Sequence, residues 1–254
     1  MRIIMAALAA LFLSTAVFAD AANIKDIEKR AQKGEAEYQY DLGMIYIRGE
    51  EVKQNFAEGL KWLKLAAAQK NADAAYQLCV MYENGEGVEK NEAESMKWCR
   101  LAAEAGSGEA QQALGMAYHY GTSGVKKDLK EAAKWLEKSY EANGNRADLT
   151  SLADIYGEMK DYLKQIGMYK KMLEGYEPYI YAAPKLVDLY YTGKGTKVDY
   201  EEAYYYWSIS TLARIPVDKK FSFEGKIKKE KKAELDAKAA EFVHSYEMNM
   251  GKGG

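Results

Sequence analysis

Few residues in this sequence combine the types and the spacing that chemistry requires. Ser123 and Lys126 form a Ser-x-x-Lys pattern, which supplies a serine nucleophile and a neighbouring lysine in penicillin-recognising enzymes. The Ser-Asp-Asn and Lys-Thr-Gly elements that complete such an active site occur nowhere in the chain. The pattern also overlaps a Gly-Val element that recurs along the sequence, so we interpret it as part of a loop.

A metal or cofactor site is not predicted either. The two histidines, His119 and His244, have no companion at the spacing of a metal-ligand set. The glycine loops at 85–87 and 193–195 lack the preceding strand and the spacing of a phosphate-binding fingerprint, and turn formation explains them. The sequence therefore predicts no catalytic residue, no metal and no cofactor.

The elements that position side chains recur along the chain. Residues 35–71 contain a Leu-Gly-x-x-Tyr motif, a glycine loop and Trp62, and a shift of 36 residues brings Trp62 onto Trp98. A further shift, with one extra loop residue, reaches Trp135. A fixed period of this size is typical of a solenoid of stacked units. We predict an all-α solenoid of five two-helix repeats, at residues 35–71, 72–107, 108–145, 146–178 and 179–214.

The helix boundaries of these repeats are marked by polar caps and glycines. The second helix of four repeats opens with an Asn or Asp that has a glutamate three residues later. This arrangement is a close variant of the capping box. The opening residues are Asn55, Asn91, Asp128 and Asp199. Gly34, Gly106 and Gly144 stand where a left-handed C-cap is expected. The repeat at 146–178 lacks the glycine loop.

Both ends of the chain depart from the repeat. Arg2, an apolar run and small residues before Ala19 predict a signal peptide at 1–19, cleaved after Ala19. A retained anchor is the alternative, but the run is shorter than a bilayer span. Residues 20–34 are predicted to form an N-terminal capping half-repeat. Residues 215–254 are predicted to form a linker and a C-terminal capping helix with an outer face rich in lysine and glutamate.

Composition excludes some classes of partner. The chain has 254 residues, 48% hydrophobic and 29% charged, and a net charge of −2 at pH 7. A balance this close to neutral, together with export, argues against nucleic acid as a partner. No stable membrane span is expected after signal cleavage, so we predict a periplasmic or secreted protein.

The sequence resembles the Sel1-like repeat family, which is related to tetratricopeptide repeats. The resemblance covers about residues 30–214, although the repeat at 146–178 looks more like a plain tetratricopeptide unit. It implies a right-handed α-solenoid that holds partner proteins. The resemblance depends on the motifs above and on two further features of the repeats, a valine in the loop and a pair of alanines in the second helix. The valines are Val52, Val88 and Val125, and the alanine pairs are Ala66-Ala67 and Ala102-Ala103.

If the resemblance holds, the first helices of the repeats line a groove that binds a protein or peptide. The positions implied to face that groove are rich in tyrosine and amides, which suit peptide recognition. The candidate partner-binding residues are Tyr40, Arg48, Tyr76, Asn84, Gln112, His119, Tyr120, Asp154, Tyr181 and Tyr191. Part of this set could equally be interfacial packing.

The two cysteines, Cys79 and Cys99, are expected to face the seam between the two helices of the repeat at 72–107. A disulfide that staples this hairpin is the first interpretation, and two buried free thiols are the alternative. For the whole chain we expect a non-enzymatic scaffold of the cell envelope. The alternatives are a β-lactam- or peptidoglycan-acting hydrolase, as described for some cysteine-rich relatives, and a secreted effector or regulatory inhibitor.

Overall fold

The computed structural model of the chain describes residues 24–49, 52–174 and 178–250. All regular secondary structure in these ranges is helical, as predicted. The predicted signal peptide at 1–19 and the start of the predicted half-repeat lie outside the described residues. Residues 24–32 are helical, and Gly34 follows them with a φ of 91°, which confirms the glycine helix end predicted there.

The chain forms two compact units, Met1–Asp128 and Leu129–Gly254. The boundary falls between the two helices of the predicted third repeat. In both units we call the helix that carries the Leu-x-x-x-Tyr motif the first helix of its repeat, and the helix that follows it the second.

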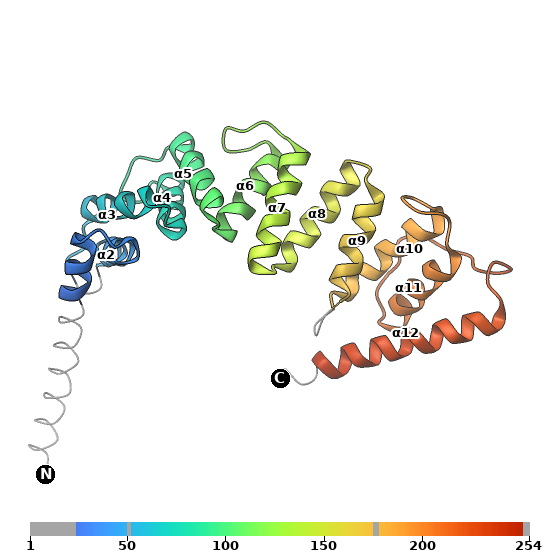
Figure 1. The fold of residues 1–254 in the computed structure, drawn as a ribbon. Helices are drawn as coiled ribbons and strands as arrows, with labels where there is room; N and C mark the ends of the chain where they lie inside the picture. Colours follow the sequence, from blue (N-terminus) through green and yellow to red (C-terminus); the bar gives the residue numbers. More distant parts are fainter. Residues whose placement is uncertain (1–23, 50–51, 175–177, 251–254) are drawn as a thin grey trace, which may run out of the picture. The chain divides into compact units, whose positions relative to one another are not determined.

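In the first unit, each helix packs on the next one along the chain. The first helices are α2 (Ala36–Arg48), α4 (Ala72–Asn84) and α6 (Gly108–Tyr120). The second helices are α3 (Phe56–Ala68) and α5 (Glu92–Ala105), and each lies between two first helices (Figure 1). The largest buried side chains at this core include Leu63, Leu78 and Met81.

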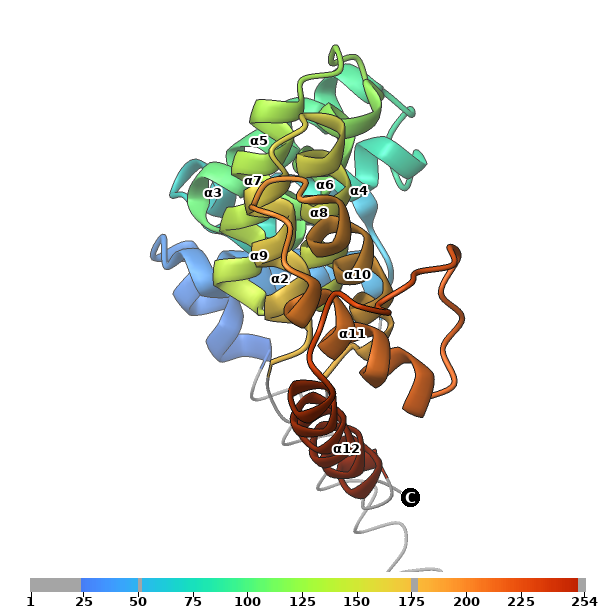
Figure 2. The same ribbon diagram turned by 90° about the vertical axis from the view of Figure 1, so that its right-hand side faces the viewer.

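The second unit continues the pairwise order and ends in a long helix. Its helices are α7 (Leu129–Asn143), α8 (Arg146–Glu158), α9 (Tyr162–Met172), α10 (Ala183–Thr192), α11 (Tyr200–Leu212) and α12 (Lys229–Met250), with the 3-10 helix η1 (Ile180–Ala182) before α10. Figures 1 and 2 both show α11 lying between α10 and α12. The predicted C-terminal capping helix is therefore present, and it packs on the last repeat.

One hydrogen bond closes the loop between the first and the second helix of each repeat in the same way. The backbone N–H of the residue that opens the second helix donates to the carbonyl of the motif tyrosine, at 2.8–2.9 Å. The five pairs are Asn55–Tyr46, Asn91–Tyr82, Asp128–Tyr118, Asp161–Tyr156 and Asp199–Tyr190. The same side chains cap the helix: Asn55, Asn91 and Asp199 each accept a backbone N–H from the first turn, as predicted.

Glycine permits a close approach of the two helices in the first repeat. A Cβ added at Gly59 would lie 2.5 Å from Ile47 Cγ1 and 2.9 Å from the Gly43 carbonyl oxygen. A Cβ added at Gly43 would lie 3.0 Å from the Leu63 side chain. The motif glycine therefore lets α2 and α3 approach closely, as the sequence indicated.

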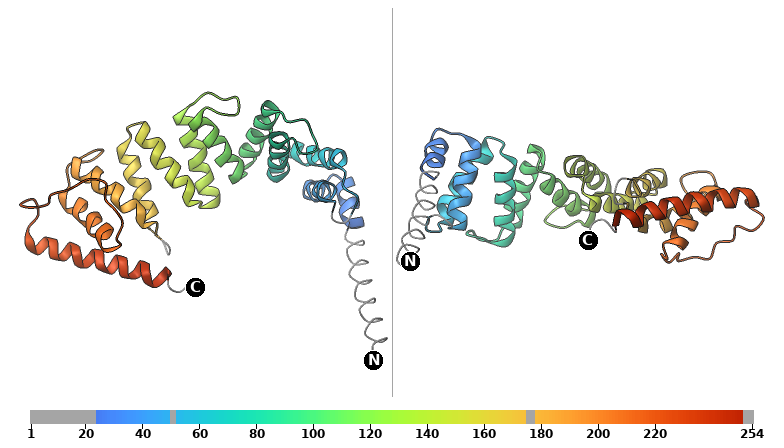
Figure 3. Two further views of the ribbon diagram at one scale, coloured as in Figure 1. Left: turned by 180° about the vertical axis from the view of Figure 1, so that it is seen from behind. Right: turned by 90° about the horizontal axis from the view of Figure 1, so that it is seen from below.

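The C-terminal helix buries one face against α11. Leu235, Ala239 and Val243 of α12 are buried, whereas most of its lysines and glutamates are exposed. Asp236 accepts hydrogen bonds from the Ser208 hydroxyl at 2.7 Å and the Tyr204 hydroxyl at 3.1 Å, both on α11. Figure 3 shows α12 running along the end of this unit. The apolar edge of the last repeat is thus covered, as a terminal cap requires.

Candidate functional site

Two adjoining clefts lie in the second unit, beside its first helices. One cleft of about 330 Å³ is bounded by α8, α9, α10 and the segment after α11, and it contains Tyr162, Gln165 and Asp188. The other, of about 320 Å³, is bounded by α8, α9, η1, α10 and residues 215–218. Both are lined by Tyr169 and Lys185, so the two hollows meet. Each is at the lower end of the size range of small-molecule sites, and together they could hold an extended peptide segment.

Tyrosines form the apolar walls of the clefts. Tyr169, on α9, is only 9% exposed, and burial raises the pKa of its hydroxyl, with the nearby Asp154 carboxylate acting in the same direction. At the η1 end, the rings of Tyr179 and Tyr181 lie 5.6 Å apart, and the Tyr181 side chain is 58% exposed. Rings held partly in solvent offer contact area at a small cost in side-chain entropy.

The charges of the clefts are unevenly compensated. The Asp188 carboxylate forms two ion pairs. Its Oδ1 lies 2.7 Å from Lys219 Nζ, and its Oδ2 lies 3.6 Å from Lys194 Nζ. Among the residues that the structure describes, no carboxylate lies within ion-pair distance of Lys185. The junction of the two clefts, which Tyr169, Lys185 and Asp218 all line, therefore presents a lysine and a carboxylate that form no ion pair with each other.

The lining of the two clefts lacks some of the side chains that catalysis most often uses. Neither cleft is lined by a serine, cysteine or histidine that could serve as a nucleophile or as a histidine base. Within the described ranges, no group of three or more histidine, cysteine, aspartate or glutamate side chains is placed to hold a metal ion. What the clefts offer is rings, ammonium groups and carboxylates at the surface.

The predicted partner-binding residues fall into three environments. Five of them are exposed: Arg48, Asn84, Tyr120, Asp154 and Tyr181. Tyr40, Tyr76 and Gln112 are half-buried on the first helices of the first unit. Of the ten, Asp154 and Tyr181 share the second cleft.

His119 and Tyr191 lie in packed surroundings. His119 is 5% exposed and stacks on the Tyr120 ring at 4.6 Å, so it offers little surface to a partner. Tyr191 contacts the rings of Phe221 and Phe223, and its hydroxyl donates to the Ser222 carbonyl. The segment before α12 thus covers part of the Tyr191 ring.

Ser123 lies in the loop after α6, as the sequence indicated. It lines a hollow of about 230 Å³ together with Tyr120 and Cys99, but Lys126 is not part of that lining. A serine nucleophile needs its base within hydrogen-bond reach. The structure therefore gives no support to the Ser-x-x-Lys pattern as a catalytic pair.

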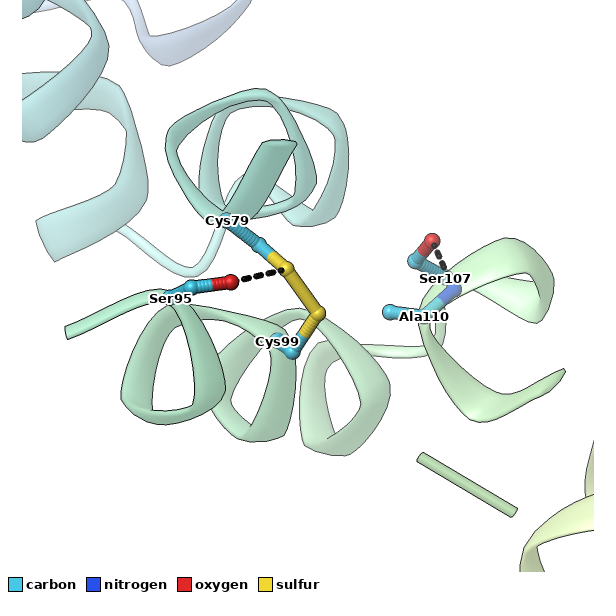
Figure 4. Close-up of a disulfide and its surroundings, with 5 residues drawn as sticks. All are labelled: Cys79, Ser95, Cys99, Ser107 and Ala110. Carbon is cyan, nitrogen blue, oxygen red and sulfur yellow. Dashed lines mark hydrogen bonds between the residues drawn. A yellow bond between two sulfur atoms is a disulfide. The ribbon is translucent and has the colours of Figure 1, made fainter. Parts of the chain in front are cut away.

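The cysteines form the predicted disulfide. Cys79 on α4 and Cys99 on α5 are bonded, with Cα atoms 5.0 Å apart, and both are buried (Figure 4). They occupy the positions that Gly43 and Leu63 hold one repeat earlier, where a glycine and a leucine are in contact. The Ser95 hydroxyl, at the position of Gly59, lies 3.5 Å from the Cys79 sulfur. The covalent link thus replaces an apolar contact of the repeat.

Sequence reasoning missed the residues at which the two clefts meet. Its groove candidates came from first helices and the residues just before them, whereas Tyr169 comes from a second helix and Asp218 from the segment after α11. The signal available was the absence of the glycine loop at 146–178, because a repeat that departs from the pattern cannot pack in the same way as its neighbours.

The fold and the clefts define a class of protein, the helical repeat proteins whose successive hairpins leave a surface for partners. A family model described as the Sel1 repeat matches residues 36–71, 72–107, 108–144 and 179–211, more than half of the chain. The chain belongs to the Sel1 repeat family. The matching model describes a repeat, and no catalytic family is evident.

Solved structures similar to this chain are also Sel1 repeat proteins. One from Oxalobacter formigenes is 36% identical and covers 52% of this chain and 98% of its own, with a TM-score of 0.48. A protective antigen of uropathogenic Escherichia coli, described as displaying an SLR fold, is 23% identical with a TM-score of 0.50. The match covers 89% of this chain and 56% of that protein. A Sel1 repeat protein from Klebsiella pneumoniae is 16% identical, covers 85% and 99% of the two chains, and has a TM-score of 0.36.

No curated protein matches the chain. In the part of the chain that the structure describes, no helix is both long enough and apolar enough to cross a bilayer.

Proposed function

We propose that this Sel1 repeat protein is a non-enzymatic scaffold that binds an extended segment of a partner protein in the adjoining clefts of its second unit. The observation that carries the proposal is the meeting of the two clefts at Tyr169 and Lys185. Buried and half-exposed tyrosine rings supply contact area, and Lys185, which forms no ion pair among the described residues, supplies a point of attachment for a carboxylate or carbonyl of the partner.

We further propose that the protein works outside the cytoplasm, in the cell envelope or beyond it. The disulfide Cys79–Cys99 supports this because structural disulfides persist in oxidising compartments. The signal-peptide pattern of residues 1–19 points the same way.

Site-specific photo-crosslinking tests the binding proposal. A photoreactive residue at Tyr181 is compared with one at Leu212, which is also exposed in the second unit but lines neither cleft. We expect a specific adduct from the photoreactive residue at position 181 in intact cells and none from that at position 212. Adding Lys185→Ala should lower the yield of the adduct at position 181. Equal labelling from both positions, or none from Tyr181, would refute the scaffold. Hydrolysis of nitrocefin by the purified protein would refute the absence of catalysis.

A further inference from the structure

The first helices of the first unit carry matching side chains in three rows. Within each helix the three positions are separated by three and four residues, so they lie on one face. Between helices the spacing is the 36-residue period. The rows are an acidic one of Glu37, Asp73 and Glu109, a polar one of Tyr40, Tyr76 and Gln112, and an apolar one of Met44, Val80 and Met116.

This face is open to solvent. The three acidic side chains are exposed, and the residues of the other two rows are half-buried. Met44 and Tyr40 touch the core of the unit without being enclosed by it. The face is therefore a helical surface with accessible rings and apolar groups and no covering element among the described residues of this unit.

The charge of this face differs from that of the second helices. Helices α2, α4 and α6 together carry five carboxylates, one arginine (Arg48) and one histidine (His119). Helices α3 and α5 carry four of each sign, with ion pairs such as Lys61–Glu58 and Lys97–Glu94. Acidic residues near helix N-termini are common in both sets, so the helix dipole does not explain the contrast. The difference is the absence of lysine from the first helices.

A carboxylate of the next repeat contributes to the raised pKa of each tyrosine in the polar row. Burial raises the pKa of Tyr40, and the largest charge effect on it is that of Asp73. Burial likewise raises the pKa of Tyr76, and there the largest charge effect is that of Glu109. Two successive repeats therefore place a phenol ring of one helix near an acidic side chain of the following first helix.

We propose that this face binds an extended, basic segment of a protein, with one arginine or lysine side chain at the Tyr40–Asp73 pair and another at the Tyr76–Glu109 pair. A cation at such a pair gains a contact with the ring face and an ion pair with the carboxylate. The apolar row receives the side chains between the two cations, which favours a peptide over a simple polyamine. This inference builds on the proposed scaffold function and assigns a partner chemistry to a second surface.

The spacing of the two cations follows from the packing of the helices. A second helix separates neighbouring first helices, and packed helix axes lie about 8–10 Å apart. The two pairs are then at least about 10 Å and at most about 20 Å apart, which an extended chain spans in about three to six residues. Basic side chains at least three positions apart should therefore bind better than adjacent ones.

Fluorescence anisotropy with synthetic peptides and the full chain tests the inference. The probe is a labelled ten-residue peptide with two arginines three positions apart and leucine or alanine between them. The matched peptides place the arginines side by side or replace both with glutamate. The variant Asp73→Asn with Glu109→Gln removes the carboxylates of the two proposed pairs, and Glu92→Gln with Glu104→Gln on α5 removes the same charge elsewhere.

We expect the spaced arginine peptide to bind, and the glutamate peptide not to bind. The Asp73→Asn, Glu109→Gln variant should weaken binding about tenfold, the α5 variant less than twofold, and added salt should weaken binding to the unaltered protein. Equal losses in both variants, or no binding of the arginine peptide, would overturn the inference. If Tyr181 still crosslinks its partner in that case, the scaffold function stands and only the basic partner is refuted.

Discussion

Removing the disulfide should destabilise one hairpin of the first unit by a predictable amount. Cys79 and Cys99 are separated by 20 positions, and for a loop of this length the chain-entropy model gives about 3 kcal/mol. Both side chains are buried, at 1% and 6% exposure, so truncation to alanine would add the cost of a cavity. Reduction leaves the sulfur atoms in place and isolates the covalent link more closely.

The chain itself suggests a matched variant. Cys79→Gly with Cys99→Leu introduces the pair found at the same positions of the first repeat, Gly43 and Leu63. Because this pair packs well there, the variant should lose the link while keeping an apolar seam. We expect the reduced protein and this variant to show similar losses, and the double alanine variant to lose more.

Urea unfolding and hydrogen exchange measure the effect. A loss of about 3 kcal/mol corresponds to a fall in Tm of about 12 °C or more for a unit near 100 residues. Exchange should accelerate mainly in α4 and α5, because each hairpin of a repeat array is stabilised by its own contacts and those of its neighbours. A loss below about 1 kcal/mol on reduction, or an effect spread evenly over α2–α6, would refute the entropic reasoning.

Three further predictions concern packing, ionisation and the C-terminal cap. Gly59→Ala should lower the free energy of unfolding, measured in urea, by about 1–3 kcal/mol, because the added Cβ has no room. Gly167→Ala in α9 should raise it by about 0.5–1 kcal/mol, because no atom lies within 4 Å of the added Cβ. Tyr191 should ionise at a lower pH than an ordinary tyrosine, because its hydrogen bond from Lys226 lowers its pKa. An ultraviolet titration curve of Tyr191→Phe that loses no early-ionising component would contradict this. Asp236→Ala should lower the free energy of unfolding by about 1–3 kcal/mol and speed proteolysis of α12, because the buried hydroxyl donors on α11 lose their acceptor. Asp236→Asn should lower the free energy of unfolding by less.

Local features of the sequence were sufficient to predict the repeat architecture. The Asn and Asp caps, the motif tyrosines and the glycine helix ends each mark a boundary through a backbone hydrogen bond or a left-handed residue. Such signals are confined to a few residues, so they can be recognised without knowledge of the tertiary structure. The pairing of Cys79 with Cys99 was predictable for the same reason, since both positions follow from the repeat.

The candidate site was predictable only in part. Asp154 and Tyr181 were identified because they occupy first-helix or preceding positions of the repeat. Tyr169, Lys185 and Lys219 were not, because their approach depends on how α9, α10 and the segment after α11 pack. The burial of His119 also depends on tertiary contacts, and its position in the motif alone placed it at the groove.

The clefts occur where the repeat pattern is weakest. The family model does not match residues 145–178, and in this stretch Lys160, with a φ of 60°, ends the short α8–α9 loop in place of the usual glycine loop. Regular repeats fill their seams with the same small set of side chains, so a departure from the set leaves space that the neighbours do not fill. Departures from local rules are expected at functional sites, where a binding surface takes precedence over packing. If the clefts bind a partner as proposed, the irregular fourth repeat determines where they form, because α8 and α9 line both clefts together with α10 of the regular fifth repeat.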